Sequence, residues 1–180
     1  VRKLAEQGLL TLWEKPVLRC REIVPAKLDG PLQLSNAQQE AYEGICYQMA
    51  GEKPGTALLY GVTGSGKTSV YIKLIQSCLD DGKSAMLLVP EIALTPQLLG
   101  LLVAYFGQQV AVLHSSLSPA ERYDQWKRVR SADAKVVVGT RSSIFAPCTA
   151  PGLIILDEEQ EHSYKSENSP RYDAREVALW

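Results

Sequence analysis

The chain has 180 residues, of which 46% are hydrophobic and 22% charged, a composition that fits a globular domain with an apolar core and excludes a disordered or fibrous chain. The formal net charge of −1 excludes an overall basic field for unspecific nucleic-acid binding, although a local basic groove remains possible. The four cysteines are scattered without a C-x-x-C pair, which favours reduced thiols in a cytosolic protein over a disulfide framework or a zinc site. No apolar run approaches the length of about 18 residues that would suggest a membrane span, and no signal peptide is visible.

The first 24 residues predict the end of a preceding domain. Residues 1–9 have a helical pattern, and residues 10–13 and 17–21 resemble short strands that suit a hairpin. This helix and hairpin would suit the tail of a winged-helix module or a structured linker, and the pattern alone does not choose between them. Two prolines and a glycine mark residues 25–33 as a linker. The chain ends inside a helix-like stretch, and we expect it to be a piece of a longer protein.

Residues 34–180 predict one α/β domain with a mainly parallel sheet covered by helices on both faces. Continuous apolar runs are typical of strands that are buried on both faces, and helical segments separate most of these runs. We expect strands at 57–60, 84–89, 110–113, 135–138 and 153–156, and helices at 36–49, 69–79, 96–106 and 119–129. Capping residues support three of the helix starts: Ser35 with Gln38, Thr95 with Pro96, and Ser118 with Glu121.

The stretch GVTGSGKT at residues 61–68 matches the P-loop pattern G-x-x-x-x-G-K-[ST]. Its glycines let the backbone N–H groups and the start of the next helix surround a phosphate. Lys67 would add a charge for the β- and γ-phosphates of ATP, and the Thr68 hydroxyl would bind Mg²⁺. The alternative is a chance glycine-rich turn, but an apolar run before it and a helix after it favour a nucleotide site. The expected nucleotide-binding residues are Gly61, Val62, Thr63, Gly64, Ser65, Gly66, Lys67 and Thr68.

Acidic residues follow the last apolar run, where the carboxyl end of a parallel strand would place them near the P-loop. We interpret Asp157 as a Mg²⁺ ligand of the Walker-B type. Its neighbour Glu158 is interpreted as the group that orients and deprotonates the attacking water. Acids at the end of a strand are often merely solvated, so the position after a P-loop carries this interpretation.

The order of these motifs resembles that of superfamily 2 helicases, whose motor lobes are RecA-like. Five stretches resemble the bacterial replication-restart helicases of the PriA family, also called primosomal protein N-prime: LLYGVTGSGKTSVY, LLVPEIALTPQ, LHSSLSPAER, VVVGTRSSIFAP and LIILDEEQEHSYKSENSPRYDAREVA. The resemblance covers residues 34–180 and implies the first RecA-like lobe, cut before motif III, of an ATP-dependent 3′-to-5′ DNA helicase. Zinc is expected only in the downstream part of such proteins.

The resemblance also implies roles for single residues. Gln38 would read the adenine base, although its spacing from Ser35 equally predicts a helix cap. The residues expected to contact DNA are Thr95, Arg141, Tyr164, Lys165, Arg171, Tyr172 and Arg175. The alternative is a plain N-cap for Thr95 and a surface or structural ion pair for Arg141. For the residues between 163 and 175 it is a solvated loop with two half-buried tyrosines.

Motif II departs from the family pattern, because Gln160 stands where these helicases usually have a histidine. That position commonly links the hydrolytic site to the rest of the motor, so the coupling of hydrolysis to DNA is in doubt. Asp173 also stands where the family often has histidine, and the sequence gives no reason for it. His162 resembles an ordinary loop histidine more than a replacement.

The implied partners are single-stranded or forked DNA, primosome proteins and single-strand-binding protein, for a monomer in the bacterial cytoplasm that does not bind membranes. The chain by itself is expected to bind Mg-ATP or ADP weakly and to hydrolyse ATP poorly. Two other functions stay open: another superfamily 2 translocase, acting on RNA or on restriction-type DNA substrates, and a regulatory module that binds nucleotide without catalysis.

Overall fold

The computed structural model describes residues 4, 7–9, 11, 19, 22–28, 30–51, 53–62 and 64–180. The expected hairpin at 10–13 and 17–21 lies almost entirely outside the described residues, as do most of the expected helix at 1–9 and Thr63 of the P-loop. The division of the chain into a preceding domain, a linker and a motor lobe therefore stays a prediction.

Parallel strands form a four-stranded sheet in the order β2-β3-β1-β4. Their bounds are Ser84–Leu88 for β1, Val110–Leu113 for β2, Val136–Gly139 for β3 and Pro151–Leu156 for β4. The register places Leu87 between Val138 and Ile155, so that the apolar runs lie side by side across the sheet. The predicted parallel sheet is confirmed, and the carboxyl ends of all four strands lie at the same end of the sheet.

The helix bounds are Asn36–Met49 for α2, Lys67–Asp80 for α3, Pro96–Phe106 for α4, Pro119–Arg130 for α5 and Ala174–Leu179 for α6. The three helices α2, α4 and α5 begin where the capping residues predict, and α3 begins two residues before its predicted start. Short 3-10 helices add η1 at Glu91–Ala93, η2 at Gly107–Gln109, η3 at Arg141–Phe145 and η4 at His162–Tyr164. Ser35 and Ser118 each form a complete capping box with the residue three positions later, and Thr95 accepts a hydrogen bond from the N–H of Leu98.

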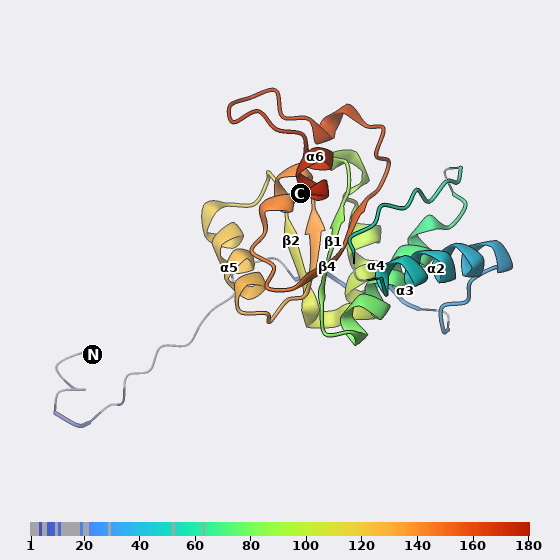
Figure 1. The fold of residues 1–180 in the computed structure, drawn as a ribbon. Coiled ribbons are helices and arrows are strands. Elements are labelled where there is room, and N and C mark those ends of the chain that lie inside the picture. The colour runs from blue at the N-terminus through green and yellow to red at the C-terminus, as the bar shows by residue number, and fades with distance from the viewer. Residues whose placement is uncertain are drawn as a thin grey trace.

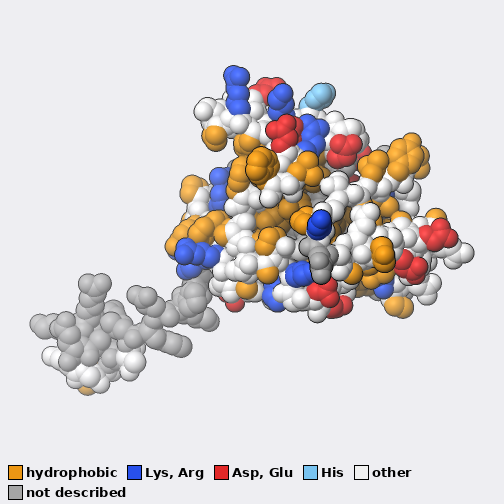
Figure 2. Space-filling model, viewed as in Figure 1, with side chains coloured by type: hydrophobic (Ala, Val, Ile, Leu, Met, Phe, Trp, Pro, Cys, Tyr) orange, Lys and Arg blue, Asp and Glu red, His pale blue; other side chains and the backbone are white. Residues whose placement is uncertain are grey.

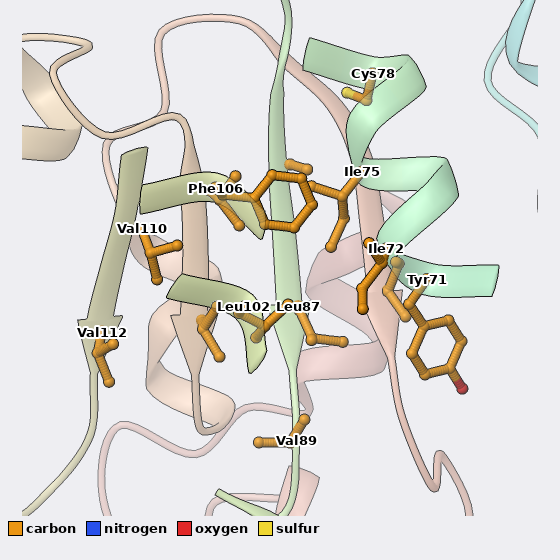
Figure 3. Close-up of a cluster of buried hydrophobic side chains, with 14 residues drawn as sticks. Tyr71, Ile72, Ile75, Cys78, Leu87, Val89, Leu102, Phe106, Val110 and Val112 are labelled. Carbon is orange, nitrogen blue, oxygen red and sulfur yellow. The ribbon is translucent and has the colours of Figure 1, made fainter. Parts of the chain in front are cut away.

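Helices cover both faces of the sheet (Figure 1). On one face, α3 and α4 pack against alternate residues of β1, β2 and β3, and Figure 3 shows the buried side chains of this cluster. The other face carries a second buried cluster, to which α5, η3, η4 and α6 contribute. The helix α2 packs mainly against α3, and Gln38 near its start is bonded to the P-loop.

The expected strand at 57–60 is wrong: no strand is assigned to these residues. Leu58 and Tyr60 are 76% and 90% exposed, and Leu59 alone of the three packs against the buried cluster. An apolar run predicts burial but does not decide whether its backbone finds a partner strand. Among the described residues β4 pairs only with β1, so β4 forms one edge of the sheet.

Among the described residues, no helix combines the length and apolar character that crossing a membrane requires. In the same part of the chain, Cys46, Cys78 and Cys148 are free thiols. The side chain of Cys148 is partly buried, and this burial raises its pKa to about 11.

Candidate nucleotide-binding site

The P-loop turns from the exposed segment before it into α3. Gly66 is the N-cap of α3 with φ 79°, and Gly64 has φ 82°, which are values that L side chains rarely adopt. A Cβ on Gly66 would also lie 2.5 Å from Nε2 of Gln38. The conformation of this loop therefore favours glycine at position 66, and a side chain there would also displace the Gln38 amide.

Gln38 connects the start of α2 to the P-loop. Its Oε1 accepts a hydrogen bond from the N–H of Ser35 at 2.9 Å and completes the capping box. Its Nε2 donates to the carbonyl oxygens of Ser65 at 3.0 Å and of Gly66 at 3.3 Å. Both ends of this amide are thus engaged, and the contact with the P-loop was not anticipated from the sequence.

Lys67 lies between its own loop and the acidic end of β4. Its Nζ donates to the carbonyl oxygen of Gly61 at 2.9 Å and lies 3.8 Å from Oε1 of Glu158. The other carboxylate oxygen of Glu158 accepts a hydrogen bond from Nε2 of Gln160 at 2.7 Å. Glu158 has φ 48°, an uncommon value for a residue with a side chain, and such strain of about 1–3 kcal/mol often marks a functional turn. The structure thus brings Lys67 of the P-loop together with Glu158 and Gln160 of motif II.

Asp157 is held from both faces of the sheet. Its N–H donates to the carbonyl oxygen of Leu88 at 2.9 Å, across from β4 to β1. From the face that carries α3, the hydroxyl of Tyr71 donates to Oδ1 of Asp157 at 2.9 Å. From the opposite face, the hydroxyl of Tyr164 donates to the main-chain oxygen of Asp157 and to that of Leu88.

Both phenols remain protonated donors at neutral pH. Burial is the main reason that the pKa of Tyr71 is raised, and the negative charge of Asp157 adds to it. The same two causes, in the same order, raise the pKa of Tyr164. Because an ionised phenol beside a carboxylate would be costly, these hydrogen bonds persist over the physiological pH range.

The residues present fit a magnesium ion of the kind that P-loop proteins use. Within the described residues, no cluster of three or more His, Cys, Asp or Glu side chains gathers as a closed metal cage would require. Mg²⁺ in NTPases needs only one or two protein oxygens, because phosphate and water supply the others. Thr68 stands three residues before Tyr71 on α3, which puts its hydroxyl on the side of the helix from which Tyr71 reaches Asp157.

Tyr164 does not lie on the surface, contrary to the expectation that it contacts DNA. Its side chain is 1% exposed, because its ring belongs to the second buried cluster and its hydroxyl is bonded to the ends of β1 and β4. In this arrangement the ring offers no face to a base. Tyr164 instead fixes the segment after β4 to the sheet.

Arg141 also holds this segment. Its guanidinium donates to the main-chain oxygens of Ser163 at 3.2 Å and Lys165 at 2.9 Å. A shallow pocket of about 290 Å³ lies beside it and is lined by Arg141, His162, Ser163, Lys165, Glu167 and Asn168. The arginine thus has a structural role, and its contact with DNA stays a prediction.

Arg175 is paired within the lobe. It donates to both carboxylate oxygens of Asp173, at 2.9 and 2.6 Å, and to the main-chain oxygen of Glu159 at 3.0 Å. The hydrogen bonds from Arg175 are the main reason that the pKa of Asp173 is lowered. Asp173 is also the N-cap of α6, which gives the physical reason for this residue that the sequence lacked.

The remaining expected DNA contacts differ in exposure. Lys165 and Arg171 are exposed, whereas Tyr172 is half-buried, with its ring centroid 4.9 Å from that of Phe145 in an edge-to-face contact. The segment of residues 161–173 protrudes from the lobe, and Figure 2 shows positive and negative side chains mixed on the protruding part. Thr95 caps α4, and its second role at a phosphate stays a prediction.

Sequence reasoning missed Tyr71 and Phe145. Tyr71 stands in an apolar helical pattern, and only the presence of a hydroxyl on the buried face of a helix signals that it needs a polar partner. Phe145 is 57% exposed, and it stands in the stretch VVVGTRSSIFAP, from which only Arg141 was expected to contact DNA. An aromatic residue two positions after the cationic and polar run of residues 140–143 is the signal that could have identified it.

Comparison with known proteins identifies one family. The DEAD/DEAH box helicase family matches residues 35–177. The replication restart protein PriA of Bacillus subtilis is 49% identical over 153 residues, which are 85% of this chain and 19% of that protein. The PriA protein of Synechocystis is 41% identical over 179 residues, which are 99% of this chain and 21% of that protein. The chain thus spans about a fifth of the length of these relatives.

A solved structure has a similar fold. The chain resembles the structure of RecG bound to a three-way DNA junction, with a TM-score of 0.66 and 28% sequence identity. The similarity covers 83% of this chain and 22% of the other. A parallel sheet with helices on both faces is thus common to this chain and to that nucleic-acid-bound protein.

Proposed function

Because the chain belongs to the DEAD/DEAH box helicase family, we propose that it is the ATP-binding motor lobe of an ATP-dependent DNA helicase that acts in replication restart. Movement in the 3′-to-5′ direction is part of this proposal, and it rests on the motif resemblance alone. Relatives named replication restart protein PriA, at 38–49% identity in several bacteria, support the restart function. RecG, the structural neighbour, was solved on branched DNA, which supports a forked substrate.

The observation that carries the proposal is the meeting of the P-loop with the end of β4. Lys67 and Glu158 approach within 3.8 Å although they are 91 positions apart in the chain, and α3 is bonded to Asp157 through Tyr71. ATP would bind at Gly61 to Thr68, with its phosphates at the N-terminus of α3. Bound Mg²⁺, held by Thr68 and Asp157, would neutralise the charge that develops on the transferred phosphate.

Glu158 would orient and deprotonate the attacking water. It lies at the site because the turn after β4 directs it toward Lys67, and Gln160 holds its second oxygen. Without a titrating histidine, Gln160 would position Glu158 through one hydrogen bond at any physiological pH.

DNA would contact the protruding segment of residues 161–173 and the neighbouring η3. The exposed Lys165 and Arg171 supply cations, and Phe145 and Tyr172 supply aromatic surface. In this proposal Phe145 and Tyr172 take the base-stacking role for which Tyr164, with its buried ring, is not available. Primosome proteins and single-strand-binding protein remain the proposed partners of the complete helicase, which would act as a monomer in the bacterial cytoplasm.

Calorimetric titration of Mg-ADP into the chain and into Lys67→Ala tests the nucleotide site. We expect binding that Lys67→Ala reduces at least tenfold, since it removes a charge aimed at the phosphates. Lys73→Ala, a change on the same helix, is the matched control and should bind as the wild type does. Equal affinity of all three proteins would contradict the proposed site. Repeating the titration with single-stranded DNA then tests whether the two ligands influence one another.

A further inference from the structure

One buried hydroxyl points at the candidate magnesium ligand. Figure 3 shows the Tyr71 ring at the border of the buried cluster, with its oxygen directed away from the apolar side chains. The residue is only 7% exposed, and its hydroxyl is bonded to Oδ1 of Asp157 at 2.9 Å. We propose that Tyr71 is a positioning residue of the magnesium site, because it fixes the orientation of the Asp157 carboxylate.

The hydrogen bonds of Asp157 leave one of its two carboxylate oxygens available for a metal ion. The N–H of the residue is bonded to Leu88, and its main-chain oxygen accepts from Tyr164, so the backbone is fixed on both sides. Tyr71 then takes one carboxylate oxygen. Among the described residues, no hydrogen bond or ion pair engages the second oxygen, which is the atom left for a metal.

The chain geometry links this hydroxyl to the P-loop. Tyr71 stands four residues after Lys67 on α3, so the helix that begins at the phosphates also carries the group that orients the acid. The ring of Tyr71 packs among Ile72, Ile75 and other buried residues, which restricts its movement. Mg²⁺ requires near-ideal octahedral geometry, so a carboxylate free to rotate is a poorer ligand than one held in place.

This inference rests on the proposed function, and its test is the magnesium dependence of nucleotide binding. A helicase of the relatives' full length, as the wild type and as Tyr71→Phe, is titrated with a fluorescent ADP analogue at several Mg²⁺ concentrations and in EDTA. Loss of a group that orients a metal ligand typically weakens metal binding about 10- to 100-fold. We expect the Mg²⁺ concentration at half-effect to rise about tenfold in Tyr71→Phe, with the affinity in EDTA unchanged.

Two further variants make the result specific. Tyr71→Met also removes the hydroxyl while it keeps an apolar side chain in the cluster, and it should shift the Mg²⁺ dependence in the same direction if the phenylalanine variant does not fold. Tyr105→Phe removes a hydroxyl from α4 and should behave as the wild type.

Each outcome has one meaning. A Mg²⁺ half-effect within twofold of the wild type overturns the inference, and so does an equal loss of affinity with and without Mg²⁺, since that would indicate a general packing role. A wild-type protein whose nucleotide binding ignores Mg²⁺ would also overturn the inference, whereas a wild-type protein that does not bind the ADP analogue at all would overturn the proposed function.

Discussion

Gln38 offers a test of how the P-loop is held, because Gln38→Glu separates its two contacts. Glutamate keeps the oxygen that accepts from the Ser35 N–H, and Ser-x-x-Glu is itself a capping box. The same change removes the N–H₂ group that donates to the Ser65 and Gly66 carbonyl oxygens and places an anion near them. We therefore expect α2 to keep its cap while the P-loop loses its support.

The size of the effect follows from those two hydrogen bonds. Each contributes about 0.5–1.5 kcal/mol net, and their partial exposure favours the lower half of that range. A total of about 1.4 kcal/mol corresponds to a tenfold weaker Mg-ADP affinity. Because Gln38 would act through the loop and not through the base, the affinity for Mg-GDP should fall by the same factor.

Calorimetry with Mg-ADP and Mg-GDP measures both affinities, and thermal unfolding checks the cap. Gln38→Ala should lose the same nucleotide affinity and in addition about 1 kcal/mol of stability, since it removes the cap as well. Gln33→Glu adds the same negative charge at an exposed position just before α2 and serves as the control. A loss confined to Mg-ADP would refute this reasoning and would support the adenine-reading role that the helicase resemblance implies.

Three further changes test other parts of the lobe. Tyr164→Phe removes a buried hydroxyl that two main-chain oxygens share, so the free energy of unfolding should fall by about 1.5 kcal/mol and the midpoint of thermal unfolding by about 3–6 °C. An unchanged midpoint would contradict the burial of this residue. Gln160→His makes the contact with Glu158 titratable, so the pH profile of ATP hydrolysis by the full-length helicase should gain a step near pH 6–7, which a profile identical to the wild type would disprove. Burial raises the pKa of Cys148 to about 11, so its thiolate is scarce at lower pH. The rate of its alkylation, measured by peptide mass spectrometry, should therefore rise steadily from pH 8 to pH 11. A rate that levels off by pH 9 would argue against this burial.

Local signals predicted most of the fold. Ser35, Thr95 and Ser118 each mark a helix start by chemistry that acts within three residues, and the structure has a cap at each of them. Four apolar runs predicted the four strands within about two residues of their ends, which is the usual uncertainty at element boundaries. The strand predicted at 57–60 is wrong because strand pairing, unlike helix capping, depends on a partner elsewhere in the chain.

The candidate site was harder to predict wherever it depends on distant contacts. Tyr164 stands in the polar run HSYKSEN, which suggests an exposed side chain, yet it is buried. Its hydroxyl finds its acceptors at Leu88, which is 76 positions away, and at Asp157. Tyr71 looks like an ordinary helix residue, and its partner lies 86 positions further along the chain. Lys67 and Glu158 were recognisable from motifs, and their approach to one another was expected because functional residues gather at the carboxyl ends of parallel strands.

The edge position of β4 affects how the lobe behaves at high concentration. A strand at the edge of a sheet presents N–H and C=O groups that can pair with another chain, and natural proteins usually shield such edges. This lobe also exposes Leu58, Tyr60 and Val62 in the apolar run that leads to the P-loop. An unpaired strand edge and exposed apolar side chains each favour association between copies, so we expect the chain in isolation to self-associate as its concentration rises. Solubility, more than folding, would then limit what can be measured on this lobe by itself.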